Sequence, residues 1–193
     1  MTQKLLITGF DPFGGETINP AWEAVKRLPD SIGSYMLCKL EIPTVFGQAS
    51  QKVLALSEEY HPDVVLCIGQ AGGRSAVTPE RIAVNIRDGK IADNAGFQPS
   101  GEPVVANGPA AYFTTVPVNE MVSAISAVGV PSVASNSAGA FVCNDTLYAL
   151  LHHYAGTATK VGFIHVPYLP EQGSPNLPLT DIVRALEAAI SAL

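Results

Sequence analysis

Cys143 is the residue of this chain whose surroundings most favour chemistry. It follows small and polar residues that lead from an expected strand at 132–135 into an expected helix at 144–153. Cys143 would then lie in the first helical turn, where unpaired backbone N–H groups and the helix dipole stabilise an anion. A thiol in that position tends to have a lowered pKa, and its thiolate attacks carbonyl carbons. We interpret Cys143 as a nucleophile, against the alternative of a buried apolar cysteine.

A cysteine nucleophile needs a base within hydrogen-bond reach, and His165 is the histidine best placed for that role. His165 ends an expected strand, and Cys143 also follows the carboxyl end of a strand, the edge at which parallel α/β sheets bind ligands. His152 and His153 would lie roughly 13–15 Å further along the helix, at about 1.5 Å per residue, and His61 occupies a turn at the opposite edge. His165 is therefore the predicted base, against the alternative of a histidine that only hydrogen-bonds at a strand end.

The acidic residue that would orient the histidine stays open on chemical grounds. Six carboxylates lie in segments that could face the site: Asp11, Glu16, Glu80, Asp88, Asp93 and Asp145. Asp145 would raise the pKa of the thiol if it pointed inward. Asp11 suits a turn ahead of Pro12 equally well. Glu80 follows a glycine-rich segment and precedes an expected strand, which ranks it among several and no higher.

Short apolar runs alternate with amphipathic stretches, as is typical of α/β proteins with a mostly parallel, twisted sheet covered on both faces. The expected strands are 4–8, 35–42, 64–68, 82–86, 132–135 and 161–165, and the expected helices are 20–28, 46–60, 118–127, 144–153 and 181–193. Residues 87–117 break the alternation, and we expect this excursion to lie over or beside the site. The prediction is a single catalytic domain, 1–193.

Composition excludes several classes of protein. Apolar residues make up 47% of the chain and charged residues 15%, which indicates a densely packed soluble protein. The net charge of −6 disfavours nucleic acid or an anionic membrane as partner, and no apolar run approaches the roughly 18 residues that span a bilayer. Three widely spaced cysteines and a short apolar N-terminus favour free thiols in the cytoplasm. No cysteine–histidine spacing is typical of zinc, so we expect no metal.

Four motifs, in this order and covering nearly the whole chain, resemble the pyroglutamyl peptidase I family (pyrrolidone-carboxylate peptidases) of cysteine peptidases. They are TGFDPFGG (8–15) with NPAW (19–22), GQAG (69–72) with ERIAVN (80–85) and DN (93–94), SAGAFVCN (137–144), and HVP (165–167). The resemblance implies a triad of Glu80, Cys143 and His165, and so assigns the carboxylate. It also implies a three-layer α/β/α sandwich, frequently a homotetramer, that uses no cofactor and removes N-terminal 5-oxoproline from peptides.

A pyroglutamyl group is a flat, uncharged lactam, and several residues are candidates to bind it. Phe10 and Phe13 would flank the ring, unless they only cover the sheet edge. Asn19, Gln70 or backbone groups of the loops would form hydrogen bonds with the lactam N–H and C=O. Phe141 and Val142 would line the site near the sulfur. A site that bonds the lactam oxygen would reject proline, because its polar groups would be left unpaired.

Two positions depart from the family pattern. Lys90 stands where bacterial relatives commonly have arginine. The lysine keeps the positive charge but lacks the planar set of donors of a guanidinium. We expect Lys90 to support the oxyanion or the triad. Ala92 replaces a proline, which could alter the stiffness of its loop. Two other functions share the same features: a cysteine amidase acting on another small amide, and a non-catalytic small-molecule binder.

Overall fold

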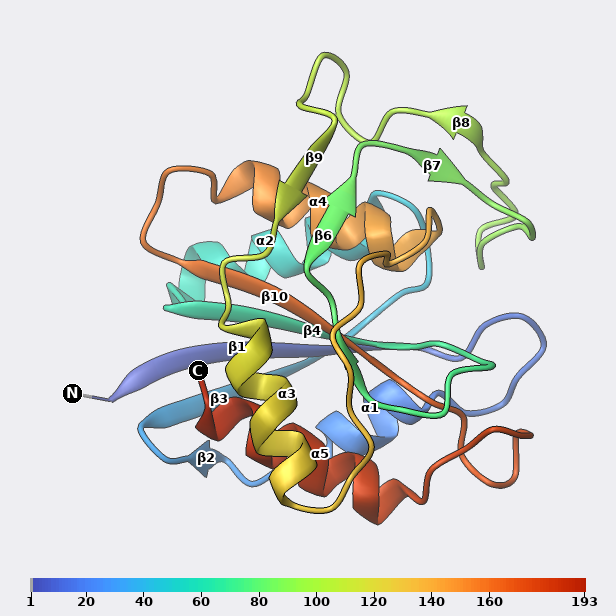
Figure 1. The fold of residues 1–193 in the computed structure, drawn as a ribbon. Coiled ribbons are helices and arrows are strands. Elements are labelled where there is room, and N and C mark those ends of the chain that lie inside the picture. The colour runs from blue at the N-terminus through green and yellow to red at the C-terminus, as the bar shows by residue number, and fades with distance from the viewer. Residues whose placement is uncertain (1) are drawn as a thin grey trace.

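The computed structural model describes residues 2–193, whose central element is a six-stranded sheet in the order β2-β3-β1-β4-β10-β5 (Figure 1). Its strands are β1 (Gln3–Phe10), β2 (Ser31–Ile32), β3 (Tyr35–Ile42), β4 (Val64–Gln70), β5 (Thr78–Pro79) and β10 (Lys160–Val166). The four central strands are parallel, and the short strands at both edges are antiparallel. This agrees with the predicted mostly parallel sheet.

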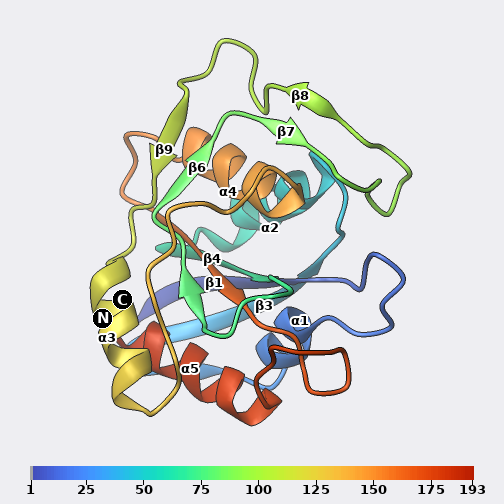
Figure 2. The same ribbon diagram turned by 45° about the vertical axis from the view of Figure 1, so that its right-hand side comes forward.

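Two small antiparallel pairs lie outside the main sheet, and both involve the excursion 87–117. Strand β6 (Ile82–Val84) pairs with β9 (Ala111–Phe113), and β7 (Arg87–Asp88) pairs with β8 (Ser100–Glu102). Figure 2 shows these strands rising above the helices α2 and α4. The excursion thus forms its own hairpins and does not add strands to the sheet.

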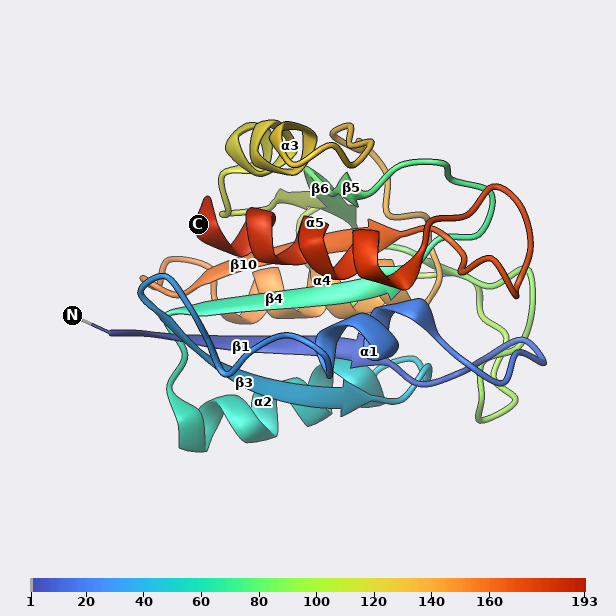
Figure 3. The same cartoon turned by 90° about the horizontal axis from the view of Figure 1, so that it is seen from below.

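Helices cover both faces of the sheet. Their bounds are α1 (Pro20–Val25), α2 (Gln48–Tyr60), α3 (Val118–Ala127), α4 (Val142–His153) and α5 (Leu179–Ser191). One hydrophobic cluster joins the sheet to α1, α3 and α5, and the other joins it to α2 and α4. Figure 3 views the sheet from the side of α1, α3 and α5. The three layers are those of an α/β/α sandwich, and no helix among residues 2–193 is long and apolar enough to cross a membrane.

Two of the predicted strands differ in the structure. Residues 132–135 form only isolated parallel bridges, from Ser132 to Val77 and from Ser135 to Glu80, which lie on either side of the two-residue edge strand β5 and do not make a continuous strand. The apolar run predicted at 82–86 ends at Val84 as a strand and pairs with β9. Both runs have the alternation of strand residues, but their partners are set by contacts distant in sequence.

Candidate active site

The candidate residues gather beyond the carboxyl ends of the parallel strands. Strand β1 is followed by α1 on one face of the sheet, and its neighbour β3 is followed by α2 on the other. Such a change of direction leaves a crevice at the strand ends, where ligands bind in open α/β sheets. Cys143 begins α4 beside this edge, and His165 lies near the end of β10.

The sulfur of Cys143 packs on the backbone of Gly69. A Cβ atom placed on Gly69 would lie 2.9 Å from Cys143 Sγ and 2.7 Å from the ring of Phe163. Gly69 is also the register partner of His165 across β4 and β10. Because paired residues of neighbouring strands face the same side, the sulfur and the imidazole lie on one face of adjacent strands.

His165 is joined to a carboxylate that is distant in sequence. The Nδ1 atom of His165 lies 2.7 Å from Oε1 of Glu80, and both side chains are buried. Glu80 follows β5, which pairs with β10 at the sheet edge, and its N–H donates to the carbonyl of Phe163. With Nδ1 as the donor to Glu80, the Nε2 atom of His165 is left as the basic nitrogen.

Arg74 is a charged neighbour of this pair that the sequence analysis did not single out. Its Nη1 atom lies 2.7 Å from Glu80 Oε1, and its Nη2 atom donates to the carbonyl of Ser137 at 3.0 Å. Its only signal in the sequence is a cation within a glycine-rich turn shortly before an acidic residue. Periodicity carries no information on such a contact.

Burial and the neighbouring charges set the ionisation of the histidine–carboxylate pair. Burial would raise the pKa of the Glu80 carboxyl, but the hydrogen bond and charge of His165, followed by the contributions of Ser135 and Arg74, outweigh it and hold that pKa below its usual range. Burial lowers the pKa of His165; Glu80 raises it in part, and Arg74 lowers it further. The resting pair is an ionised carboxylate with a neutral imidazole.

The lowered thiol pKa expected from the start of the helix is not found. Part of the surface of Cys143 reaches solvent, but its sulfur is enclosed by Gly69 and Phe163. This burial raises the pKa of Cys143 to about 12, and Glu80 adds to the effect, while Arg74 and the N–H of Cys143 itself oppose it. Cys143 therefore carries a neutral thiol at neutral pH, because desolvation outweighs the helix dipole.

The other candidate carboxylates hold the loops around the site. Asp11 Oδ1 accepts from the N–H of Thr44 at 2.6 Å. Asp93 Oδ2 accepts from the N–H of Phe46 at 3.0 Å. Asp145 is fully buried and accepts from the N–H of Gly47 at 2.8 Å, so it points away from the sulfur as expected. These carboxylates position the 44–47 loop and leave Glu80 as the partner of the histidine.

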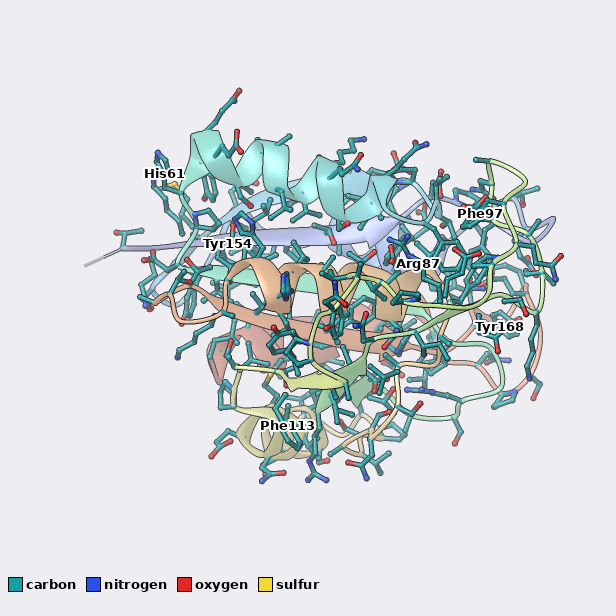
Figure 4. The ribbon with its side chains drawn as sticks, turned by 90° about the horizontal axis from the view of Figure 1, so that it is seen from above. His61, Arg87, Phe97, Phe113, Tyr154 and Tyr168 are labelled. Atoms are coloured by element: carbon teal, nitrogen blue, oxygen red, sulfur yellow. The ribbon has the colours of Figure 1, made fainter. Side chains whose placement is uncertain are left out.

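The tip of the excursion lies beside the site, where it was expected. Asn94 donates from its N–H to the carbonyl of Thr44 and from its side chain to the carbonyl of Pro12. Closer to the nucleophile, the N–H of Asp88 donates to the carbonyl of Ala140. In Figure 4, Arg87 and Phe97 lie at this end of the molecule, and His61 lies at the opposite end.

Four aromatic rings from separate segments pack in a chain near the start of α4. Ring centroids are 6.1 Å apart for Phe13 and Phe141, 5.2 Å for Phe141 and Phe46, and 5.9 Å for Phe46 and Phe97. Phe10 instead is 1% exposed and packs on Phe163 in the core. The aromatic wall therefore comprises Phe13 and Phe141, with Phe46 and Phe97 as members that the sequence analysis missed.

Three other residues that were predicted to contact the substrate make hydrogen bonds elsewhere or lie in the core. Asn19 caps α1, with Oδ1 accepting from Ala21 and Nδ2 donating to the carbonyl of Asp11. Gln70 follows Gly69 on β4, so its side chain faces the opposite side of the sheet, where Oε1 accepts from Gln172. Val142 is fully buried in the core.

The remaining candidate cation and histidines make no hydrogen bond or ion pair with Glu80, Cys143 or His165 among residues 2–193. Lys90 is exposed in the segment after β7, whereas Arg74 is the cation that contacts Glu80. His61 ends α2 in a left-handed conformation, and His152 Nδ1 lies 2.9 Å from the hydroxyl of Tyr112. These placements follow the geometry expected for the histidines but give no contact that would support the role predicted for Lys90.

Comparison with known proteins gives one consistent result. The family model described as pyroglutamyl peptidase matches residues 3–193. The pyrrolidone-carboxylate peptidase of Levilactobacillus brevis is 56% identical, over 98% of this chain and 97% of its own. The crystal structure of Bacillus amyloliquefaciens pyroglutamyl peptidase I has a TM-score of 0.96 at 43% identity, covering 98% and 96% of the two chains. The pyrrolidone carboxyl peptidase of Thermococcus litoralis has a TM-score of 0.94 at 36% identity, covering 99% and 93%.

Proposed function

The chain belongs to the pyroglutamyl peptidase family, and we propose that it hydrolyses the amide bond after an N-terminal pyroglutamyl residue, with Cys143 as nucleophile, His165 as base and Glu80 as the group that orients the base. The observation that carries the proposal is the shared environment of these side chains. Glu80 Oε1 lies 2.7 Å from His165 Nδ1, and the sulfur of Cys143 packs on Gly69, the strand partner of His165.

The reaction begins from a neutral thiol and a neutral imidazole. As Sγ of Cys143 attacks the pyroglutamyl carbonyl, Nε2 of His165 takes the thiol proton and an S–C bond forms. The resulting oxyanion would accept hydrogen bonds from N–H groups at the start of α4, a turn that no side chain caps. Glu80 stabilises the imidazolium that forms in this step.

Collapse of the tetrahedral intermediate breaks the C–N bond, and His165 returns the proton to the departing amine. The acyl group is then held as a thioester on Cys143. His165 next takes a proton from water, the hydroxide attacks the thioester carbon, and the S–C bond breaks with return of the proton to sulfur. Pyroglutamate and the shortened peptide are the products.

The pyroglutamyl ring would bind against the aromatic wall. Phe13 and Phe141 offer flat apolar faces close to the nucleophile, since Phe141 directly precedes α4. The side chains of Asn19 and Gln70 make other hydrogen bonds, so the lactam N–H and C=O are best served by backbone groups of the surrounding loops. Such polar contacts would select 5-oxoproline over proline.

A fluorogenic pyroglutamyl amide tests this function directly. Wild-type protein should release the fluorophore, and Cys143→Ala should lower kcat/KM by about 10⁴-fold or more, because the covalent route is lost. Cys38→Ser is the matched control and should retain activity, since Cys38 lies on β3 away from the site. Thiol labelling at Cys143 without turnover would indicate an amidase for another substrate, and absence of both would indicate a binder.

We also propose that the protein is a cytoplasmic homotetramer. The family resemblance supports the tetramer, and the three free cysteines support a reducing compartment. Large apolar side chains are available on the surface for subunit contacts, among them Met36, Phe113 and Val133. Light scattering of the purified protein would give four times the chain mass of 20.2 kDa if the assembly is correct, and a monomer mass would contradict it.

A further inference from the structure

One oxygen of Glu80 binds both Arg74 and His165. Arg74 Nη1 and His165 Nδ1 each lie 2.7 Å from Glu80 Oε1. The second oxygen, Oε2, is buried and accepts no hydrogen bond from the residues that the structure describes. The two side-chain hydrogen bonds that orient the carboxylate among the described residues are therefore those of Arg74 and His165 at Oε1, and Ser135 adds to the stabilisation of its charge.

We propose that Arg74 is a positioning residue for the reaction, which keeps the Glu80 carboxylate charged and correctly oriented toward His165. The inference rests on the proposed function, because it gives Arg74 a part in the same triad. Arg74 acts through Glu80: its own side chain is 30% exposed, whereas that of Glu80 is fully buried. It supplies the positive charge that lets a carboxylate stay ionised without water.

The contacts of Arg74 need the planar fork of a guanidinium. Besides Glu80, its Nη1 donates to the hydroxyl of Thr78 at 2.5 Å, and its Nη2 donates to the carbonyl of Ser137 at 3.0 Å. These partners belong to β5 and to the loop that leads to Cys143. A lysine keeps the charge but lacks the rigid set of donors that reaches all three groups at once.

Loss of this charge has a defined chemical consequence. The charged and titratable groups around the imidazole are Glu80, Arg74 and the thiol of Cys143. Without Arg74, the Glu80–His165 pair holds a proton more tightly, since the remaining charge is negative. A protonated Glu80 would itself donate to Nδ1, which reverses the tautomer of His165 and removes the basic character of Nε2.

The test compares Arg74→Met and Arg74→Lys with the control Arg81→Met. Arg81 directly follows Glu80 in the chain, but its guanidinium donates to Asn119 and Asn136 and makes no ion pair with Glu80 among the described residues. Two quantities are measured: the pH dependence of kcat/KM for a fluorogenic pyroglutamyl amide, and the pKa of His165 by NMR titration. The NMR measurement stays informative even if this substrate is not hydrolysed, so failure of the proposed function can be told from failure of this inference.

Arg74→Met should lower kcat by about 10²-fold with KM little changed. It should also raise the pKa of His165 and shift the acid limb of the pH profile, the decline of kcat/KM on the acidic side, to higher pH. Arg74→Lys should keep the acid limb near its wild-type position with a smaller loss of kcat, and Arg81→Met should change neither quantity. An unchanged His165 pKa and acid limb in folded Arg74→Met would overturn the inference.

If Arg74→Met fails to fold, Arg74→Ala is assayed with added methylguanidinium. Arg74 lines a surface cavity of about 540 Å³ together with its hydrogen-bond partners Thr78 and Ser137, so the space left by the guanidinium is open to such a cation from solvent. Recovery of activity would support the inference, and a folded Arg74→Ala with no recovery would contradict it. Arg74→Lys with wild-type kcat would show that the fork is not needed and would also count against it.

Discussion

Burial favours a neutral thiol at Cys143 and a neutral imidazole at His165, and under the proposed function these charge states determine how catalysis begins. Burial raises the pKa of Cys143 to about 12 and lowers that of His165 below its usual value. Both shifts oppose separation of charge before the substrate arrives. In the proposed mechanism, proton transfer from sulfur to His165 would therefore accompany attack on the carbonyl, and the start of α4 would stabilise the oxyanion that follows.

The first prediction concerns the pH dependence of kcat/KM, which reports the pKa values of the free enzyme. His165 must be neutral to accept a proton, and its pKa lies below the ordinary value of 6.5. Activity should therefore persist as pH falls through 6.5 and decline only at lower pH. On the alkaline side, no loss is expected up to about pH 9, since the thiol titrates near 12. A bell-shaped profile that falls between pH 7 and 9 would instead indicate a preformed thiolate–imidazolium pair.

Alkylation by iodoacetamide gives a second measure of the same state. Cys143 should be modified well before Cys67, which is fully buried. The rate at Cys143 should rise with pH through 9 without reaching a plateau, because the reactive thiolate remains a minor species. Equal modification of the two cysteines in native protein, mapped by mass spectrometry, would contradict this assignment.

Among the elements, the proposed triad depends on close approach between α4 and the sheet. Gly69 on β4 leaves room for the sulfur, and the ring of Phe163 on β10 fills the remaining space. The same strand, β10, carries His165. The sheet therefore positions both groups: it carries His165 directly on β10, and it leaves space next to Gly69 for the sulfur of Cys143.

Gly69→Ala should reduce activity more than stability. The added Cβ would lie 2.9 Å from Cys143 Sγ and 2.7 Å from Phe163, so the sulfur and the ring would have to shift from their present positions. We expect a loss of kcat/KM of about 10²-fold, the size of effect that misplacement by an ångström can produce. Overpacking should also cost about 1–3 kcal/mol of the free energy of unfolding.

Gly162→Ala is the control for this substitution. Gly162 lies on β10, the strand that carries His165. A Cβ atom on Gly162 would lie 2.5 Å from the side chain of Val116 and would not meet the sulfur of Cys143. It should destabilise the protein by a similar amount and leave the activity of the folded fraction unchanged. Equal losses of activity in both variants, measured after correction for folded fraction by circular dichroism, would contradict a specific role for Gly69.

At the scale of the whole molecule, the excursion 87–117 is joined to the site by a buried ion pair. Arg87 Nε lies 2.5 Å from Asp145 Oδ1, and Asp145 also binds the N–H of Gly47. One carboxylate thus connects β7, the start of α4 and the loop before α2. These segments lie far apart in sequence, so their arrangement depends on the complete fold.

Arg87→Met should lower the free energy of unfolding by roughly 3 kcal/mol, because it leaves the Asp145 charge buried without its cation. Arg184→Met is the matched control, since the pair between Arg184 and Asp181 is solvent-exposed and should contribute less than about 1 kcal/mol. Urea denaturation of both variants measures the difference. Similar midpoints for the two variants would show that the Arg87–Asp145 pair adds nothing to stability.

Much of the architecture can be predicted from the sequence, because helix and strand periodicity is a local property. The strand at 35–42 and the helix at 118–127 have the predicted bounds, and the other central strands and helices differ only at their ends. The run at 132–135 was predicted as a strand but forms only bridges. Local alternation indicates an extended chain, but the partner that makes it a strand comes from elsewhere in the molecule.

For the site, the chemical types can be read from the sequence alone: a thiol at the start of a helix, a histidine near a strand end, and a family motif that points to Glu80. The contacts and the charge states depend on the folded arrangement. It places Glu80 against His165 across 85 residues of chain, adds Arg74 to the same oxygen, and encloses the sulfur of Cys143 so that it stays protonated. Burial and distance set pKa values and hydrogen bonds, and both arise only when remote segments pack together.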